Sequence, residues 1–120
     1  MIQSCQAQHI GFLTLPQATI GNRLRDFPEA LDELLKKPNV RMFQSPRVSE
    51  ELILKVHAPE MPKMVARDLL CSTAYESAGG VVAAMEALAQ GEIDRAFCFI
   101  GAGGHHAGYR QFWGACCFND

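Results

Sequence analysis

Three short apolar runs alternate with amphipathic stretches along this chain and predict a mixed α/β fold. Residues 9–15, 40–44 and 96–100 have the length and composition of β-strands. The last run is apolar throughout, which is typical of a strand buried on both faces of a parallel sheet. Because helical stretches separate the runs, the order of elements predicts parallel strands joined by right-handed crossovers.

A 3.6-residue apolar period predicts two helices in the first half of the chain. The first begins at Asp26, which has the position of an N-cap, and ends at Pro38, which cannot continue a helix. Ser49 is the expected cap of the second helix, which runs to His57. Prolines interrupt the chain after that point, so at most a broken helix is expected up to Leu70.

The clearest helical pattern covers residues 74–91. Thr73 and Glu76 have the spacing of a capping box at its start, and a glycine marks its end. Gly79 and Gly80 lower the helix propensity inside it. We therefore expect this pair to allow close packing against a neighbouring segment.

Composition narrows the class of protein. The 120 residues suit one domain, residues 1–120, and 48% hydrophobic with 20% charged residues is typical of a globular chain. A net charge of -2 provides no basic field, so no nucleic-acid partner is expected. No run approaches the roughly 20 apolar residues of a membrane helix, and the N-terminus has no signal-peptide pattern. We therefore expect a cytoplasmic protein without a membrane partner.

The cysteines are odd in number and show no CxxC spacing. This pattern argues against a disulfide framework and against a structural zinc ribbon. Free cysteine packs as a small hydrophobic residue, so buried free thiols are expected instead. The five positions are Cys5, Cys71, Cys98, Cys116 and Cys117.

The last twenty residues, 101–120, hold the candidate chemistry. They contain five glycines and no clear periodicity, and loops of this length are uncommon unless they have a function. They follow a predicted strand and so lie at the carboxyl edge of the sheet, where open α/β folds bind ligands. Adjacent His105 and His106 suit two coupled proton-transfer groups beside one reacting centre.

Three interpretations of this loop compete. It resembles a dinucleotide-binding loop, but His106 occupies the position of the required third glycine and no helix follows. It could form a metal site from His105, His106 and the cysteines, although neighbouring histidines seldom bind one ion and carboxylates are missing. It could also carry the proton-transfer pair of a metal hydrolase. The other histidines, His9 and His57, are expected to be structural.

Two motifs in register favour the third interpretation. Residues 104–107 read Gly-His-His-Ala, and residues 114–120 read Gly-Ala-Cys-Cys-Phe-Asn-Asp. The pair resembles the signature of the zinc-dependent histone deacetylase, acetylpolyamine amidohydrolase and acetoin utilization superfamily, Gly-His-His-Ala followed by Gly-Phe-Cys-x-Phe-Asn-Asn. The helix over residues 74–91 is similar to the one that precedes the tandem histidines in that family. The resemblance covers nearly all of this chain but only about the first third of a family catalytic domain.

The resemblance implies roles for individual residues. His105 matches the general base that activates zinc-bound water, and His106 matches the acid or electrostatic partner. Ala115 stands where the family has a tunnel phenylalanine. The implied substrate-binding residues are Gly104, Gly114, Ala115 and Cys116.

The resemblance also implies a fold and a cofactor. The expected fold is three-layer α/β with a small parallel sheet of strand order 2-1-3, the N-terminal portion of an arginase/deacetylase-like fold. Family members hold zinc with an Asp-x-His pair and a further Asp, which follow the region matched here. We therefore expect no metal ligand and no cofactor in this chain.

The expected function is a truncated deacetylase-like module that carries the tandem-histidine loop and has no deacetylase activity alone. The alternative is one part of a zinc-dependent amide hydrolase that another chain completes, so enzyme activity is left open. The implied strand order makes residues 96–100 an exposed apolar edge, which recruits other chains. We therefore expect a homodimer around that strand or the helix over residues 74–91.

Overall fold

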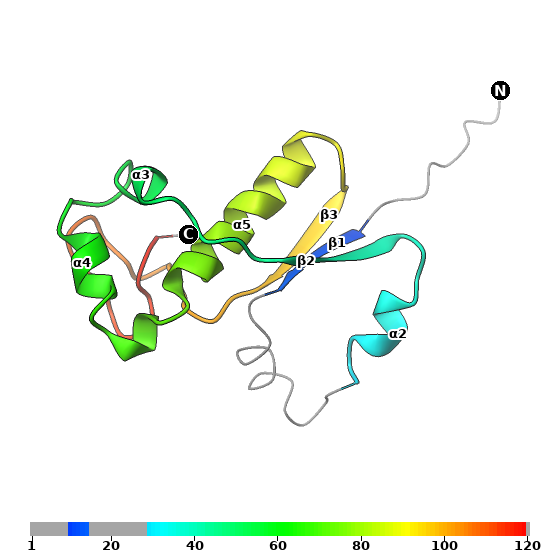
Figure 1. The fold of residues 1–120 in the computed structure, drawn as a ribbon, viewed down its shortest axis with the longest axis horizontal. Helices are drawn as coiled ribbons and strands as arrows, with labels where there is room; N and C mark the ends of the chain where they lie inside the picture. Colours follow the sequence, from blue (N-terminus) through cyan, green and yellow to red (C-terminus); the bar gives the residue numbers. More distant parts are fainter. Residues whose placement is uncertain (1–9, 15–28, 120) are drawn as a thin grey trace.

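The structure is a computed structural model, and it describes residues 10–14 and 29–119 (Figure 1). The strands are β1 (Ile10–Thr14), β2 (Val40–Gln44) and β3 (Arg95–Phe99). The helices are α2 (Asp32–Leu35), α3 (Glu50–Ile53), α4 (Met61–Val65), the 3-10 turn η1 (Leu69–Cys71) and α5 (Ala74–Ala89). Within the described residues, no helix combines the length and the apolarity that crossing a membrane requires.

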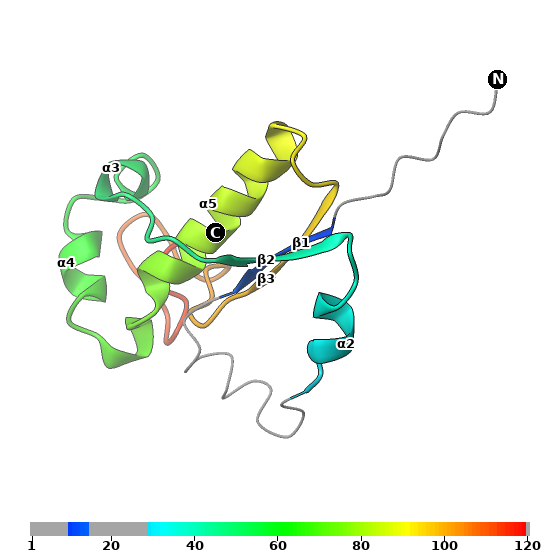
Figure 2. The same ribbon diagram turned by 45° about the vertical axis from the view of Figure 1, so that its right-hand side comes forward.

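The three strands form one open sheet in which β1 lies between β2 and β3, and both pairings are parallel. Ile10 is opposite Val40 on one side and Arg95 on the other, and each register continues over five residue pairs. α5 packs against β1 and β3, and it lies beside the sheet in both Figure 1 and Figure 2. The predicted mixed α/β character is confirmed.

The strand boundaries agree closely with the apolar runs. β2 occupies residues 40–44 as predicted, and β3 begins and ends one residue earlier than expected. The first predicted helix is described only from residue 29, where a turn leads into α2. The predicted cap Asp26 and the histidine at position 9 lie outside the described residues.

α3 confirms the expected cap, because the Ser49 side chain accepts a hydrogen bond from the Leu52 backbone N–H at 3.3 Å. The helix itself ends at Ile53, and turns complete the chain to His57. α4 and η1 then follow as separate short pieces, with Pro62 in the first turn of α4. The predicted broken helix is therefore confirmed.

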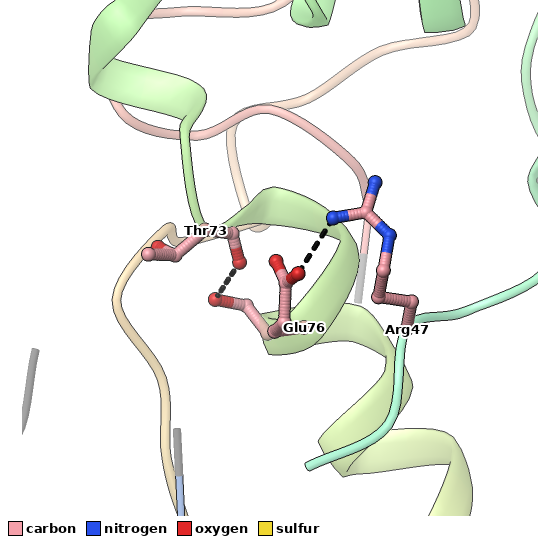
Figure 3. Close-up of polar contacts among 4 residues, drawn as sticks. Arg47, Thr73 and Glu76 are labelled. Carbon is pink, nitrogen blue, oxygen red and sulfur yellow. Dashed lines mark hydrogen bonds and ion pairs between the residues drawn. The ribbon is translucent and has the colours of Figure 1, made fainter. Parts of the chain in front are cut away.

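α5 begins at the predicted residue without the predicted capping box. Thr73 occupies the N-cap position, but its side chain makes no capping bond. The other partner of the predicted box, the Glu76 carboxylate, points at Arg47 (Figure 3), whose Nη1 donates to Oε1 at 2.6 Å. Arg47 also stacks on the Tyr75 ring, 4.6 Å from its centroid. Glu76 therefore forms an ion pair with Arg47, from the segment after β2, in place of the predicted capping bond.

The glycine pair in α5 confirms the expected close approach. A Cβ placed on Gly79 would meet the Pro46 carbonyl oxygen and lie 2.7 Å from the Val48 backbone nitrogen. A Cβ on Gly80 would lie 2.5 Å from the Ser45 hydroxyl. Only a residue without a side chain lets the segment after β2 run this close to the helix.

The main buried cluster lies beyond the sheet, where α3, α4 and the start of α5 meet the loop after β3. Figures 1 and 2 both show that loop, coloured orange to red, beside α4 and the first turns of α5. Ala102, Cys117 and Phe118 belong to this cluster together with helical residues such as Val65 and Ala78. The loop is therefore part of the core.

β3 has one open face. Its Cys98 side chain turns toward α5, with Sγ 3.9 Å from the Gly80 carbonyl oxygen, whereas Phe97 is 56% exposed. Successive side chains of a strand point to opposite faces, and among the residues that the structure describes, α5 covers the face that carries Cys98. The prediction that this strand is buried on both faces is wrong.

Candidate functional site

Ser77 in α5 attaches the beginning of the loop to the helix. Its hydroxyl donates to the Thr73 carbonyl at 2.8 Å and accepts from the backbone N–H groups of Gly101 and Ala102, at 3.2 and 3.0 Å. Ser77 is buried, so these bonds replace the water that its hydroxyl would otherwise need. The helix thereby sets the direction in which the chain leaves β3.

The two ends of the loop pair with each other. The Cys117 backbone N–H donates to the Gly103 carbonyl at 3.0 Å, and Gly103 and Cys116 form an isolated parallel bridge. Trp113 and Cys116 close a tight turn through two backbone bonds of 2.9 and 3.2 Å. Gly114 lies in that turn with φ +52°, a conformation that glycine adopts without strain.

His57 holds the loop from the helical side. Its Nδ1 lies 2.9 Å from the Gly108 carbonyl oxygen, and its Nε2 accepts the Asn119 backbone N–H at 2.9 Å. A carbonyl can only accept, so Nδ1 carries the proton and the ring is the neutral Nδ1–H tautomer. The side chain is 1% exposed and both nitrogens are occupied. His57 is therefore structural, as predicted.

Further bonds fix the stretch around the tandem histidines. The Ala107 backbone N–H donates to the Gly104 carbonyl at 2.8 Å, which closes a turn with His105 and His106 at its centre. The Asn119 side-chain amide donates to the carbonyls of Ala107 and Gly104 at 3.3 and 3.5 Å. The histidine pair therefore has a defined backbone conformation.

A disulfide joins η1 to the loop, which corrects the expectation of free thiols. Cys71 and Cys117 are bonded across a sequence separation of 46 residues, with their Cα atoms 5.8 Å apart. The packing of η1 under the loop brings these two together, and no spacing rule reveals such a pair. Cys98 and Cys116 are free. Burial raises the pKa of the Cys98 thiol.

The predicted catalytic histidines lie side by side. The rings of His105 and His106 have centroids 3.9 Å apart and planes inclined by 54°, and both side chains are exposed. Each Nδ1 lies 3.8 Å from the Cys116 Sγ. The buried thiol thus faces both imidazoles, and the donor atoms of these three residues all lie within 4.8 Å of one another.

The predicted substrate-binding residues fall into two groups. Gly104, which begins the histidine turn, and Cys116, whose Sγ faces both imidazoles, are buried, whereas Gly114 and Ala115 are exposed in the neighbouring turn. Trp113, 72% exposed, precedes that turn. The structure therefore brings Cys116 to the histidines and leaves Gly114 and Ala115 at the surface.

Sequence reasoning missed two residues that position the site. Ser77 connects α5 to the start of the loop, and Asn119 connects its end to the histidine turn. The bonds of Ser77 span 24 and 25 residues, so local propensity carries no signal for them. Asn119 lies inside the second motif, which was the only available signal.

Comparison with known proteins agrees with the arrangement of the loop. Residues 62–120 match the family model described as the histone deacetylase domain. The matched segment begins in α4 and includes α5, β3 and the loop with the tandem histidines. No curated protein matches the chain.

Proposed function

This chain is a partial member of the histone deacetylase superfamily through residues 62–120, and we propose that its loop supplies the tandem-histidine part of an amide-hydrolysing site. The observation that carries the proposal is the pair of exposed imidazoles, with ring centroids 3.9 Å apart, on a turn held by a backbone bond and by two part-buried bonds from the Asn119 amide. Neutral imidazole accepts a proton and imidazolium returns it near neutral pH, which is the chemistry of general acid–base catalysis.

The two histidines have separate parts in this proposal. His105 takes a proton from the attacking nucleophile, and His106 stabilises the charge that develops or protonates the departing amine. Ser77, His57 and Asn119 are positioning residues in this proposal, because they hold the backbone on either side of the pair. Gly104, Gly114, Ala115 and Cys116 are the proposed substrate contacts.

The zinc of the family does not fit residues of this chain in the family's manner. The 120 residues contain no Asp-x-His pair, and zinc sites need three or four properly spaced ligands. When bound by a family member, zinc polarises the substrate carbonyl and activates water. We propose that these 120 residues alone are a deacetylase-like module without that chemistry, and that the alternative is completion by another chain.

The sheet and the loop also support a proposal about the whole fold. We propose that the β2-β1-β3 sheet with α5 is the N-terminal portion of the three-layer arginase/deacetylase-like fold. In this proposal β3 becomes an internal strand when the remaining part is present. The open face of β3, with Phe97 56% exposed, is then the surface on which that part packs.

The activity test uses the 120-residue chain, an acetyl-lysine peptide and an acetylated polyamine, with and without added zinc. We expect no turnover from the chain alone. The control variant is Arg110→Ala, which changes an exposed residue of the same loop. Zinc-dependent turnover that disappears in His105→Ala and persists in this control would overturn the inactive-module proposal and show that the chain is an enzyme. Adding a chain that carries an Asp-x-His segment tests the alternative, which fails if turnover does not appear.

We also propose that copies of this chain pair as a two-fold homodimer around β3 or α5. β3 is the end strand of the described sheet, and edge strands pair readily with other chains. Light scattering at micromolar concentration should give twice the mass of one chain. Phe97→Lys should lower the measured mass toward that of one chain. A stable monomer, or a dimer unaffected by changes in both β3 and α5, contradicts the pairing.

A further inference from the structure

The histidine turn has a second property that proton transfer does not require: a buried thiol lies beneath both imidazoles. Cys116 Sγ lies 3.8 Å from Nδ1 of His105 and 3.8 Å from Nδ1 of His106. Ligand atoms of one tetrahedral zinc ion, with bonds of about 2.3 Å to sulfur and about 2.1 Å to nitrogen, are roughly 3.4–3.6 Å apart. The two sulfur–nitrogen distances therefore need to close by only a few tenths of an ångström, and all three donor atoms already lie within 4.8 Å of one another.

We propose that His105, His106 and Cys116 form a binding site for a thiophilic divalent ion, with Zn²⁺ the best fit. Two imidazole nitrogens and one thiolate match the donor preference of zinc, and three protein ligands leave a fourth position for water or a small ligand. The site lacks carboxylates, so it differs from the Asp-x-His arrangement of the family. The inference does not depend on the proposed function, because metal binding is measured without turnover.

The turn explains how neighbouring histidines can both bind one ion. The bond from the Ala107 N–H to the Gly104 carbonyl, 2.8 Å long, makes His105 and His106 the two central residues of the turn. The chain reverses there, and both Nδ1 atoms end on the side of Cys116. In an extended strand the two side chains would point to opposite faces.

Gly103 gives the donor atoms the room they need. A Cβ at this position would lie 3.1 Å from the Cys116 Sγ and 3.9 Å from the His105 Nδ1. The same residue positions the thiol, because its carbonyl accepts the Cys117 backbone N–H at 3.0 Å. One glycine therefore both fixes Cys116 beneath the turn and keeps the space above its sulfur open.

Binding requires a simple exchange at the thiol. The Cys116 S–H bond breaks, the sulfur–metal bond forms with the electron pair of the thiolate, and the proton passes to the solvent. Each imidazole binds through the Nδ1 lone pair and keeps its proton on Nε2. Neither change involves an oxidant or a reductant, and both histidines are exposed, so an ion can enter from solvent.

The test is a titration of the purified chain, with its disulfide intact, by Co²⁺ and Zn²⁺. Co²⁺ should give a thiolate-to-metal charge-transfer band at one equivalent, and Zn²⁺ should abolish that band and compete with a chromophoric chelator. Cys116→Ser should lose the band. Cys98→Ser, which removes the other free thiol of the part of the chain that the structure describes, should keep it.

Three results would overturn the site: no band in the unaltered chain, a band that persists in Cys116→Ser, or a band that disappears in Cys98→Ser. His105→Asn and His106→Asn change exposed side chains, so they decide the question even if Cys116→Ser does not fold. Each should remove one equivalent of tight Zn²⁺ binding. Retention of that equivalent in both variants also overturns the proposal. Absence of deacetylase activity has no bearing on any of these outcomes.

Discussion

His57 allows the strongest test of how the loop is held. Replacing it by leucine keeps a side chain of similar size and removes both ring nitrogens. Two hydrogen bonds of 2.9 Å disappear, one to the Gly108 carbonyl and one from the Asn119 N–H. Both bonds are part-buried, and each partner left unsatisfied costs about 1–3 kcal/mol, a figure that already includes the lost bond. We expect the free energy of unfolding to fall by about 2–5 kcal/mol.

Urea unfolding followed by far-ultraviolet circular dichroism measures this loss through the midpoint and slope of the transition. The matched control is His105→Leu, the same chemical change at an exposed position, which should alter stability by less than about 0.5 kcal/mol. A loss below about 1 kcal/mol for His57→Leu would refute the reasoning, because the two bonds could then not be what fixes the loop. Equal losses in both variants would refute it as well.

Three other perturbations have expected outcomes. Gly79→Ala should destabilise by at least about 2 kcal/mol in urea, because the new Cβ meets rigid backbone. Gly108→Ala, whose Cβ would have only ordinary contacts at 3.7 Å, should be tolerated, and similar losses for both variants would contradict the close approach. Reduction of Cys71–Cys117, which closes a 46-residue separation, should cost about 4 kcal/mol on the chain-entropy estimate, and an unchanged urea midpoint after reduction would contradict that link. Burial raises the pKa of the Cys98 thiol. The stability that this protonated thiol contributes is therefore present below the pKa of the unfolded thiol and is lost as pH rises above about 9. Cys98→Ala should flatten the fall in unfolding free energy at alkaline pH, and a profile of unfolding free energy against pH identical to that of the unaltered chain would exclude the effect.

Local chemistry in the sequence was sufficient for several features. Residues 40–44 form the predicted strand, and Ser49 caps α3, because apolar period and capping act within a few residues. The Gly79 and Gly80 pair predicted a close approach without naming its partner. The two-part motif placed His105 and His106 in one loop at the end of a strand.

Contacts between distant residues were decided by the tertiary structure. The Glu76 carboxylate lies where a capping box needs it, yet it bonds Arg47, which comes from 29 residues earlier in the chain. The ion pair uses Oε1 alone and leaves Oε2 buried without a partner among the described residues, so the packing of the segment after β2 against α5, and not a shortage of acceptor oxygens, turns the carboxylate toward Arg47. The exposure of Phe97 was also decided by tertiary packing. The apolar run predicts a strand, but it does not determine which face of the sheet a helix covers.

The cysteines separate most clearly what the sequence determines from what the tertiary structure decides. The sequence establishes five cysteines and two neighbouring histidines, and from spacing alone it disfavours both a disulfide and a shared metal site. Folding brings Cys71 to Cys117 and Cys116 to the histidine turn. Spacing rules describe ligands on one continuous element, whereas these groups meet because η1, α5 and the two ends of the loop pack into one core. The identity of the reactive groups is therefore local information, and their juxtaposition exists only in the folded chain.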